Sequence, residues 1–207
     1  MTTISLVRHG LVENPNQVYY GRLAGFGLAQ LGRAQAAAAG RLLAAESVAA
    51  IYHSPMQRAA ETAALLHAQM PAPVPLVESP LLNEIHSPYD GLTVAEMERR
   101  NWDFYSQLST PHEFPNDVLG RVVAFFDMAR RRHAGQHVVG VSHGDPIAFA
   151  ILWAFGRPAT AEQRQLLRDC GVAEGYPSHA SISSFTWPDG APERTVSYRY
   201  RTPPTPI

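Results

Sequence analysis

Short apolar runs alternate with longer segments of helical periodicity along the chain, and this alternation constrains the fold more than any other feature. The runs expected to form strands are Thr3–Arg8, Val48–His53, Val74–Val77 and Gln136–Ser142. The segments expected to form helices are Leu31–Glu46, Met56–Ala68, Thr93–Leu108, Asp117–His133 and the stretch from Asp145 to about Phe155, with Thr93 and Asn116 or Asp117 as candidate caps. Such a sequence predicts a single-domain three-layer α/β/α sandwich with a mostly parallel central sheet.

The carboxyl-terminal part of the chain has a different pattern. Two late runs, Ser181–Trp187 and Arg194–Tyr200, flank the turn residues Pro188-Asp189-Gly190 and predict a β-hairpin. The segment Thr202–Ile207 contains three prolines and has no pattern of either kind. We therefore expect one domain over residues 1–201, followed by a proline-rich tail over residues 202–207.

Composition and charge indicate an ordinary globular protein. The chain has 207 residues, of which 45% are hydrophobic and 17% are charged, and its formal net charge is −1. A charge so close to zero gives no reason to expect nucleic acid or a membrane surface as a partner. The apolar start stops at Arg8, and no later run is long enough to span a bilayer, so we expect a cytoplasmic protein. The composition is compatible with a homodimer and does not decide the question.

Two of the expected strands end in the same pair of residues, a histidine followed by a glycine. His9-Gly10 follows the first strand, and His143-Gly144 follows Gln136–Ser142. Ligands of open α/β sheets bind beyond the carboxyl ends of the strands. The sequence therefore predicts that both histidines face one crevice.

The second of these strand ends also fits a different chemistry. Residues 140–144 match the Gly-x-Ser-x-Gly pattern of a nucleophile elbow, which would make Ser142 the nucleophile of a serine hydrolase. Asp169 and His179 follow in the order that such an enzyme needs. The chain has no upstream oxyanion motif of the HGGG type, and this hypothesis leaves His9 unexplained. It is therefore a distant alternative.

Five segments of the chain carry a further signal when they are taken in order. They are LVRHG (6–10), GLAQLGRAQA (27–36), IYHSPMQRAAETA (51–63), LLNEIHSPYDG (81–91) and VVGVSHGDPI (138–147). Together they resemble the signatures of the histidine phosphatase superfamily, the phosphoglycerate-mutase-like group. The resemblance implies a phosphoglycerate-mutase-like fold and phosphoryl transfer through a phosphohistidine.

Four residues of these segments fit the chemistry of phosphoryl transfer. The resemblance implies that His9 is the nucleophile, and that Glu84 protonates the leaving alkoxide and then activates water. Arg8 and Arg58 would hold the phosphoryl group, because a guanidinium gives permanently charged, bidentate contacts to phosphate. If Glu84 is not the acid, Asp90 and Asp145 are the next candidates.

The remaining contacts to phosphate are expected from a histidine, an amide and an asparagine. His143, either protonated or hydrogen bonding, and the start of a helix at Gly144 would complete the phosphate site. Members of this group commonly carry an asparagine shortly after the first histidine-glycine pair, and Asn14 and Asn16 are both candidates for its role. The arginines supply the counter-charge, so we expect neither a metal nor a cofactor.

The function expected from this set is a metal-independent, histidine acid phosphatase-like phosphomonoesterase for a small phosphorylated substrate. The nearest alternative is a phosphoglycerate mutase, since Arg99-Arg100 loosely resembles the paired arginines that bind the substrate carboxylate in mutases. The chain is short for a mutase and contains no lysine for the substrate clamp. A non-enzymatic adaptor is a third hypothesis, but an adaptor has no need of the complete set of site residues.

Overall fold

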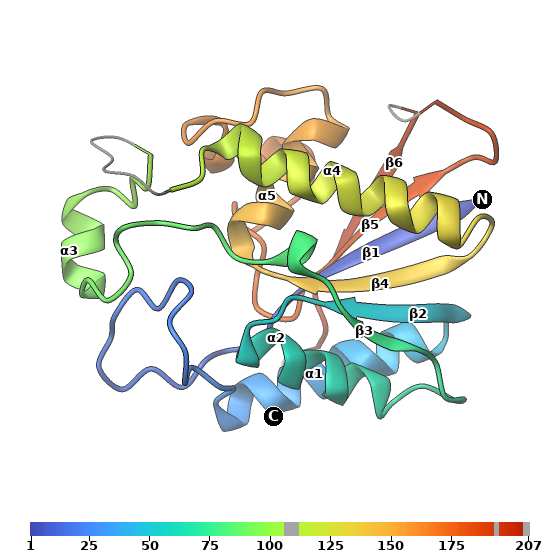
Figure 1. Ribbon diagram of the computed structural model, residues 1–207, viewed down its shortest axis with the longest axis horizontal. Coiled ribbons are helices and arrows are strands. Elements are labelled where there is room, and N and C mark those ends of the chain that lie inside the picture. The colour runs from blue at the N-terminus through green and yellow to red at the C-terminus, as the bar shows by residue number, and fades with distance from the viewer. Residues whose placement is uncertain (106–111, 193–194, 205–207) are drawn as a thin grey trace.

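A six-stranded sheet forms the centre of the molecule, and helices pack on both of its faces (Figure 1). The computed structural model describes residues 1–105, 112–192 and 195–204. The strands are β1 (Thr2–Arg8), β2 (Val48–His53), β3 (Leu76–Glu78), β4 (His137–Ser142), β5 (Ile182–Trp187) and β6 (Ser197–Arg201). They lie in the order β3-β2-β4-β1-β5-β6.

Strand directions agree with a mostly parallel sheet. β1 and β2 both pair in parallel with β4, and β3 pairs in parallel with β2. β5 is antiparallel to both β1 and β6, so the last two strands form the predicted hairpin. The predicted fold class, a single-domain α/β sandwich, is confirmed.

Two layers of helices cover the sheet. The helices α1 (Gln30–Ala44) and α2 (Gln57–His67) pack on one face, and α4 (Pro115–Arg132) and α5 (Gly144–Ala154) pack on the other (Figure 1). The connections contain α3 (Val94–Arg99) and the short 3₁₀ helices η1 (Pro80–Leu82) and η2 (Gln163–Cys170).

β4 shows how one strand serves both layers. Val138 belongs to the core beneath α4 and α5, whereas Val139 and Val141 belong to the core beneath α1 and α2. This alternation follows from the two-residue period of side chains along a strand. A side chain at Gly140 would lie only 3.1 Å from the ring of Phe125, so α4 packs closely on the strand at this point.

The central position of β1 determines where the site lies. Its register with β4 runs from Thr3 opposite His137 to Arg8 opposite Ser142, so the two strands end side by side. His9 and His143 each follow directly after one of these ends. The rings of these two histidines lie 5.2 Å apart between centroids.

The helix predicted over Thr93–Leu108 is wrong in its length. The predicted cap is correct, because the Thr93 hydroxyl accepts a hydrogen bond from the Glu96 amide at 3.2 Å. The helix nevertheless ends at Arg99, because Asn101 and Trp102 have φ angles of 51° and 54°, which no α-helix contains. Residues 106–108 of the prediction lie outside the described residues.

Two further boundaries differ from the prediction. α4 starts at Pro115, and the Asp117 carboxylate accepts a hydrogen bond from the Phe114 amide at 2.9 Å. Neither Asn116 nor Asp117 is therefore the N-cap, because proline at the first position begins the helix earlier. The third strand covers Leu76–Glu78 instead of Val74–Val77, where it pairs with residues 51–53 of β2.

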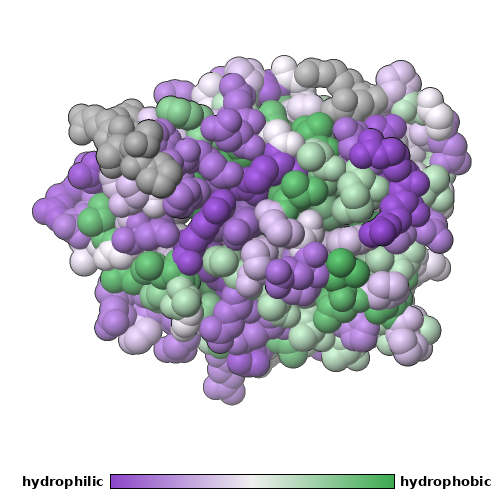
Figure 2. All heavy atoms as spheres, in the orientation of Figure 1, coloured by the Kyte–Doolittle hydropathy of each residue, from purple (hydrophilic) through white to green (hydrophobic). Residues whose placement is uncertain are grey.

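Hydrophilic and hydrophobic side chains are interspersed over the coloured part of the face in Figure 2, and its apolar areas are small. Among the described residues, no helix has both the length and the apolar character needed to cross a bilayer.

Candidate active site

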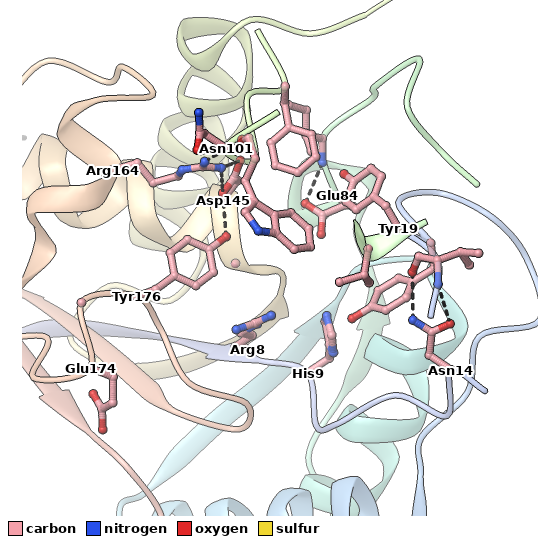
Figure 3. A pocket seen from close by; sticks show the side chains of 18 of the residues that line it. Arg8, His9, Asn14, Tyr19, Glu84, Asn101, Asp145, Arg164, Glu174 and Tyr176 are labelled. Carbon is pink, nitrogen blue, oxygen red and sulfur yellow. Dashed lines mark hydrogen bonds and ion pairs between the residues drawn. The ribbon is translucent and has the colours of Figure 1, made fainter. Parts of the chain in front are cut away.

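A cavity of about 600 Å³ opens beyond the carboxyl ends of β1 and β4 (Figure 3). Arg8 and His9 reach it from the end of β1, and Asp145 reaches it from the first turn of α5. Glu84 lines another part of the wall, on the chain after η1. The position agrees with the general location of ligand sites in open α/β sheets.

His9 is buried, and a backbone hydrogen bond fixes its ring. Its Nδ1 lies 2.8 Å from the carbonyl oxygen of Gly10. Because a carbonyl can only accept, Nδ1 carries the hydrogen and Nε2 keeps a lone pair in the neutral ring. Burial lowers the pKa of His9 well below its usual value, and the charges of Arg58 and Arg8 lower it further. The neutral imidazole, which is the nucleophilic form, is therefore favoured at pH 7.

Distant parts of the chain hold the backbone around His9. The amide of Ala180, which precedes β5, donates to the carbonyl of Arg8 at 2.9 Å. On the other side, a Cβ atom at Gly10 would lie 2.3 Å from the carbonyl oxygen of Gly32 in α1. The glycine after the histidine is therefore required by the close approach of α1.

Two arginines supply positive charge around His9. Arg58 is 1% exposed, and its Nη2 donates to the Gly21 carbonyl at 2.7 Å. Arg8 donates through Nη1 to the Pro177 carbonyl at 2.7 Å. The Nε of each arginine is buried and has no hydrogen-bond partner among the described residues. Unpartnered donors on buried cations favour an anionic ligand.

His143 belongs to a chain of hydrogen bonds that fixes its tautomer. Its Nδ1 lies 3.1 Å from Nη2 of Arg58 and can only accept there, so its Nε2 donates to the Ser54 hydroxyl at 2.8 Å. Ser54 in turn donates to the side-chain oxygen of Asn83 at 3.3 Å. Burial, followed by the charge of Arg58, lowers the pKa of His143 well below its usual value. Of the two forms considered from the sequence, the geometry favours the neutral hydrogen-bonding one.

Glu84 has the properties of a carboxyl that exchanges protons near neutral pH. Its Oε2 lies 3.8 Å from Nη2 of Arg58 and 3.6 Å from Nδ1 of His143, while Oε1 accepts from the Ile85 amide at 2.9 Å. Burial raises the pKa of Glu84 to about 7, against the opposing charge of Arg58. A carboxyl with such a pKa can donate and recover a proton at physiological pH.

Comparison with known proteins decides the family. The sequence profile of the histidine phosphatase superfamily (branch 1) matches residues 4–187. The chain belongs to this superfamily. The protein Rv0525 of Mycobacterium tuberculosis is 38% identical over 210 residues, covering 98% of this chain and 96% of its own. Phosphoserine phosphatase 1 of Hydrogenobacter thermophilus is 31% identical over 175 residues, covering 75% and 82%. The structure of Bacillus stearothermophilus YhfR superposes with a TM-score of 0.76 at 25% identity, covering 92% and 94%.

In this member of the superfamily, three charged side chains that the sequence did not reveal hold the backbone at Asn83 and Glu84. Glu113 accepts from Nη2 of Arg22 at 2.8 Å and from Nε of Arg121 at 2.6 Å. Arg22 also donates to the Glu84 carbonyl at 2.8 Å, and Arg121 donates to the Asn83 carbonyl at 3.1 Å. Arg22 is 91 residues away from Glu113 in the sequence, so no local pattern connects it with the other two charged residues.

A second network that the sequence missed lies in the cavity wall of the histidine phosphatase. Both carboxylate oxygens of Asp145 accept from Nη1 of Arg164, at 2.9 and 2.8 Å. The hydroxyls of Tyr105 and Tyr176 donate to the same carboxylate at 2.8 and 2.6 Å. Both oxygens of this carboxylate are therefore occupied by donors from other side chains. This arrangement does not suit Asp145 as the alternative acid.

The remaining predicted phosphate ligands of this family member differ in their surroundings. Gly144 lines the cavity, and a Cβ atom there would lie 2.2 Å from the Tyr176 hydroxyl, so only glycine fits. Asn14 also lines the cavity, but its amide donates to the Val18 carbonyl at 2.8 Å and accepts from the Val18 amide at 3.2 Å. Asn16 is exposed and is not among the lining residues. Asn14 is thus the better candidate of the two, and it also shapes its own loop.

Of the residues that would support the alternative functions, His179 lies beside His9, with 5.8 Å between the ring centroids, and the others lie outside the cavity lining. The Ser142 hydroxyl is fully buried and donates to the Leu82 carbonyl at 2.8 Å, whereas Asp169 is largely exposed and pairs with Arg157. Arg99 and Arg100, the candidate mutase pair, are exposed and are not among the residues that line the cavity. Within the described residues, no group of three or more His, Cys, Asp or Glu side chains could hold a metal ion.

Proposed function

We propose that this member of the histidine phosphatase superfamily is a phosphomonoesterase that works through a phosphohistidine on His9. The observation that carries the proposal is the hydrogen bond from Nδ1 of His9 to the Gly10 carbonyl, which leaves the lone pair of Nε2 free near the buried Arg58 and the half-buried Arg8. An uncharged nitrogen nucleophile next to cations is suited to attack a phosphoryl group whose charge the cations neutralise.

The first step forms the phosphoenzyme. Nε2 of His9 attacks phosphorus, the bond from phosphorus to the ester oxygen breaks, and the carboxyl proton of Glu84 passes to the departing alkoxide. Arg8 and Arg58 hold the phosphoryl oxygens throughout, and neutral His143, whose ring nitrogens are engaged with Arg58 and Ser54, positions the Arg58 guanidinium. The step needs Glu84 protonated and His9 neutral, and the raised and lowered pKa values of these two residues both favour it.

The second step reverses the role of Glu84. The carboxylate left by the first step takes a proton from water, the oxygen of that water attacks phosphorus, and the bond between phosphorus and Nε2 of His9 breaks. Inorganic phosphate leaves, and both residues return to their starting states. The proposed chemistry requires neither a metal nor a cofactor.

The location, substrate size and partners of the protein belong to the same proposal. The protein acts in the cytoplasm on a small phosphoester. Neither nucleic acid nor a membrane is a partner, and the protein can form a homodimer. The relative named phosphoserine phosphatase 1 supports hydrolysis. The position of Arg99 and Arg100 away from the cavity lining disfavours the mutase alternative.

Trapping the intermediate tests the proposal. The protein is mixed with a phosphoester, quenched at once, and examined by intact-mass and peptide mass spectrometry for an added phosphoryl group on His9. We expect the adduct in the native protein and in Ser142→Ala, and no adduct or turnover in His9→Ala. An adduct absent from the native protein, or one that depends on Ser142 instead of His9, overturns the mechanism. Interconversion of 2- and 3-phosphoglycerate faster than phosphate release would favour the mutase.

A further inference from the structure

The cavity next to the phosphate site also restricts the alcohol half of the ester. We infer that this half is uncharged and presents a flat or apolar face, and that the Asp145–Arg164 ion pair in the cavity wall enforces the choice. The inference rests on the proposed phosphatase function and specifies its substrate class.

The charges of Asp145 and Arg164 balance each other within the cavity wall. The side chains of Arg164 and Asp145 are 8% and 4% exposed, and two tyrosine hydroxyls occupy the other acceptor positions of the carboxylate. Nη2 of Arg164 donates to the Trp102 carbonyl at 3.0 Å. The guanidinium therefore lines the cavity with its charge balanced, and a substrate carboxylate would have to compete with a buried one.

The other cations in the described lining of this part of the cavity are weak partners for a second anionic group. Arg8 is committed to the phosphoryl group in the proposed mechanism. The remaining charged lining residues are Arg168 and Glu174, both exposed and of opposite sign, and Arg168 donates to the carbonyls of Ala173 and Glu174. A second anionic group on the substrate would lose hydration here and could gain only the solvent-screened charge of the exposed Arg168.

The uncharged part of the lining is largely apolar. It contains Val18, Tyr19, Ile85, Val94, Trp102 and Phe104. The rings of Tyr19 and Phe104 lie 4.8 Å apart between centroids, and those of Trp102 and Phe104 lie 6.2 Å apart. Trp102 is 37% exposed, and its backbone lies in the left-handed region. A strained backbone that places an uncovered indole at a cavity suits contact with a flat ligand.

Matched pairs of esters test the inference on the native protein. Phenyl phosphate is compared with 3-carboxyphenyl phosphate, glycerol 1-phosphate with 3-phosphoglycerate, and 2-phenylethyl phosphate with ethyl phosphate, and phosphoserine is added as a further acid. We expect kcat/KM to be at least about tenfold higher for the member of the first two pairs whose alcohol half is uncharged, since an anionic group without a good partner loses its hydration at a greater cost than a neutral one. We expect 2-phenylethyl phosphate to be preferred to ethyl phosphate, and phosphoserine to be a poor substrate.

Two variants test the residues responsible. Asp145→Asn leaves Arg164 with an unbalanced charge. The preference for esters whose alcohol half is uncharged should therefore fall by roughly tenfold. Asp169→Asn makes the same chemical change in the exposed pair with Arg157, outside the cavity lining, and should leave the preference unchanged. Trp102→Ala should reduce the preference for 2-phenylethyl over ethyl phosphate.

Failure of the inference can be distinguished from failure of the proposed function. Phosphate release that is equal for the members of each pair, or faster for the acids, overturns the substrate class while the phosphatase function stands. Equal effects of Asp145→Asn and Asp169→Asn on the preference overturn the role of the Asp145–Arg164 pair. If no ester releases phosphate, including p-nitrophenyl phosphate, the proposed function fails and the inference fails with it.

Discussion

Glu84 lies within 4 Å of one cationic and one neutral partner, and its contacts make its role testable through the leaving group. Alkyl esters expel a basic alkoxide that needs a proton, whereas p-nitrophenyl phosphate expels a stable phenolate that does not. General acid catalysis contributes about 10²–10⁴-fold. We therefore expect Glu84→Gln to slow phosphorylation of His9 by an alkyl ester by roughly that factor, and by the aryl ester much less.

Single-turnover formation of the phosphoenzyme separates this effect from the later hydrolysis. The variant and the native protein are compared with both esters under the same conditions. Equal slowing with both esters would show that Glu84 has a structural role.

The same carboxyl determines a pH dependence. Burial raises the pKa of Glu84 to about 7, so its acid form, which phosphorylation requires, is present below pH 7 and is lost as the pH rises through that value. His9 adds no loss on the acid side near neutrality, because its pKa is well below the usual value. We expect kcat/KM for an alkyl ester to fall tenfold per pH unit above about pH 7.

The Glu84→Gln variant provides the control for this profile, since ionisation of the ester affects both proteins equally. The fall above pH 7 should disappear from the variant. A variant profile that keeps the same alkaline fall would assign the titration to another group.

At the scale of single residues, the sequence could propose only those site members that belong to local signatures, and their roles stay predictions. Arg8, His9 and His143 each stand at the end of a strand, where a motif of a few residues marks them. The side chains of Tyr105, Arg164 and Tyr176 meet Asp145 from three separate segments, so only the folded chain brings them together.

At the scale of elements, the approach of α1 to the end of β1 depends on Gly10. A side chain there would collide with backbone atoms of Gly32, which cannot move aside as a side chain could. We expect Gly10→Ala to destabilise the protein by about 1–3 kcal/mol, the usual cost of overpacking, and to reduce activity by displacing His9. Thermal unfolding followed by circular dichroism measures the loss.

The same substitution in α4 offers a matched control with the opposite sign. Gly120 is exposed, and nothing lies within 4 Å of a Cβ atom built there. Gly120→Ala should therefore raise stability, by up to about 1 kcal/mol, because alanine is the better helix former. A midpoint for Gly10→Ala equal to that of the native protein would contradict the close contact with α1.

Helical periodicity correctly predicted where most elements lie but not where α3 ends. The apolar spacing after Thr93 continues past Arg99, whereas two residues with positive φ stop the helix. Such backbone angles depend on tertiary contacts, among them the hydrogen bond from Arg164 to the Trp102 carbonyl. Helix propensity and apolar spacing are local properties, so they cannot reveal a contact with a residue 62 positions away.

At the scale of the whole molecule, the predicted sandwich is confirmed because its layers follow from the order of strands and helices. The division into a domain over residues 1–201 and a tail over 202–207 stays a prediction. β6 ends at Arg201, which pairs with Glu46 and so ties the last strand to the segment after α1.

The place of β1 in the sheet has a consequence for how the protein is made. Both neighbours of β1 come from much later in the chain, residues 137–142 and 182–187. A chain growing on the ribosome therefore cannot pair its first strand until Ser142 has emerged, and the second edge of that strand stays unpaired until Trp187 has emerged. His9 is made among the first residues, but its backbone is held by groups made much later, the Ser142 carbonyl and the amide of Ala180. A nascent or prematurely terminated chain thus has His9 without the pocket that activates it, and catalytic competence begins only when synthesis has passed β5.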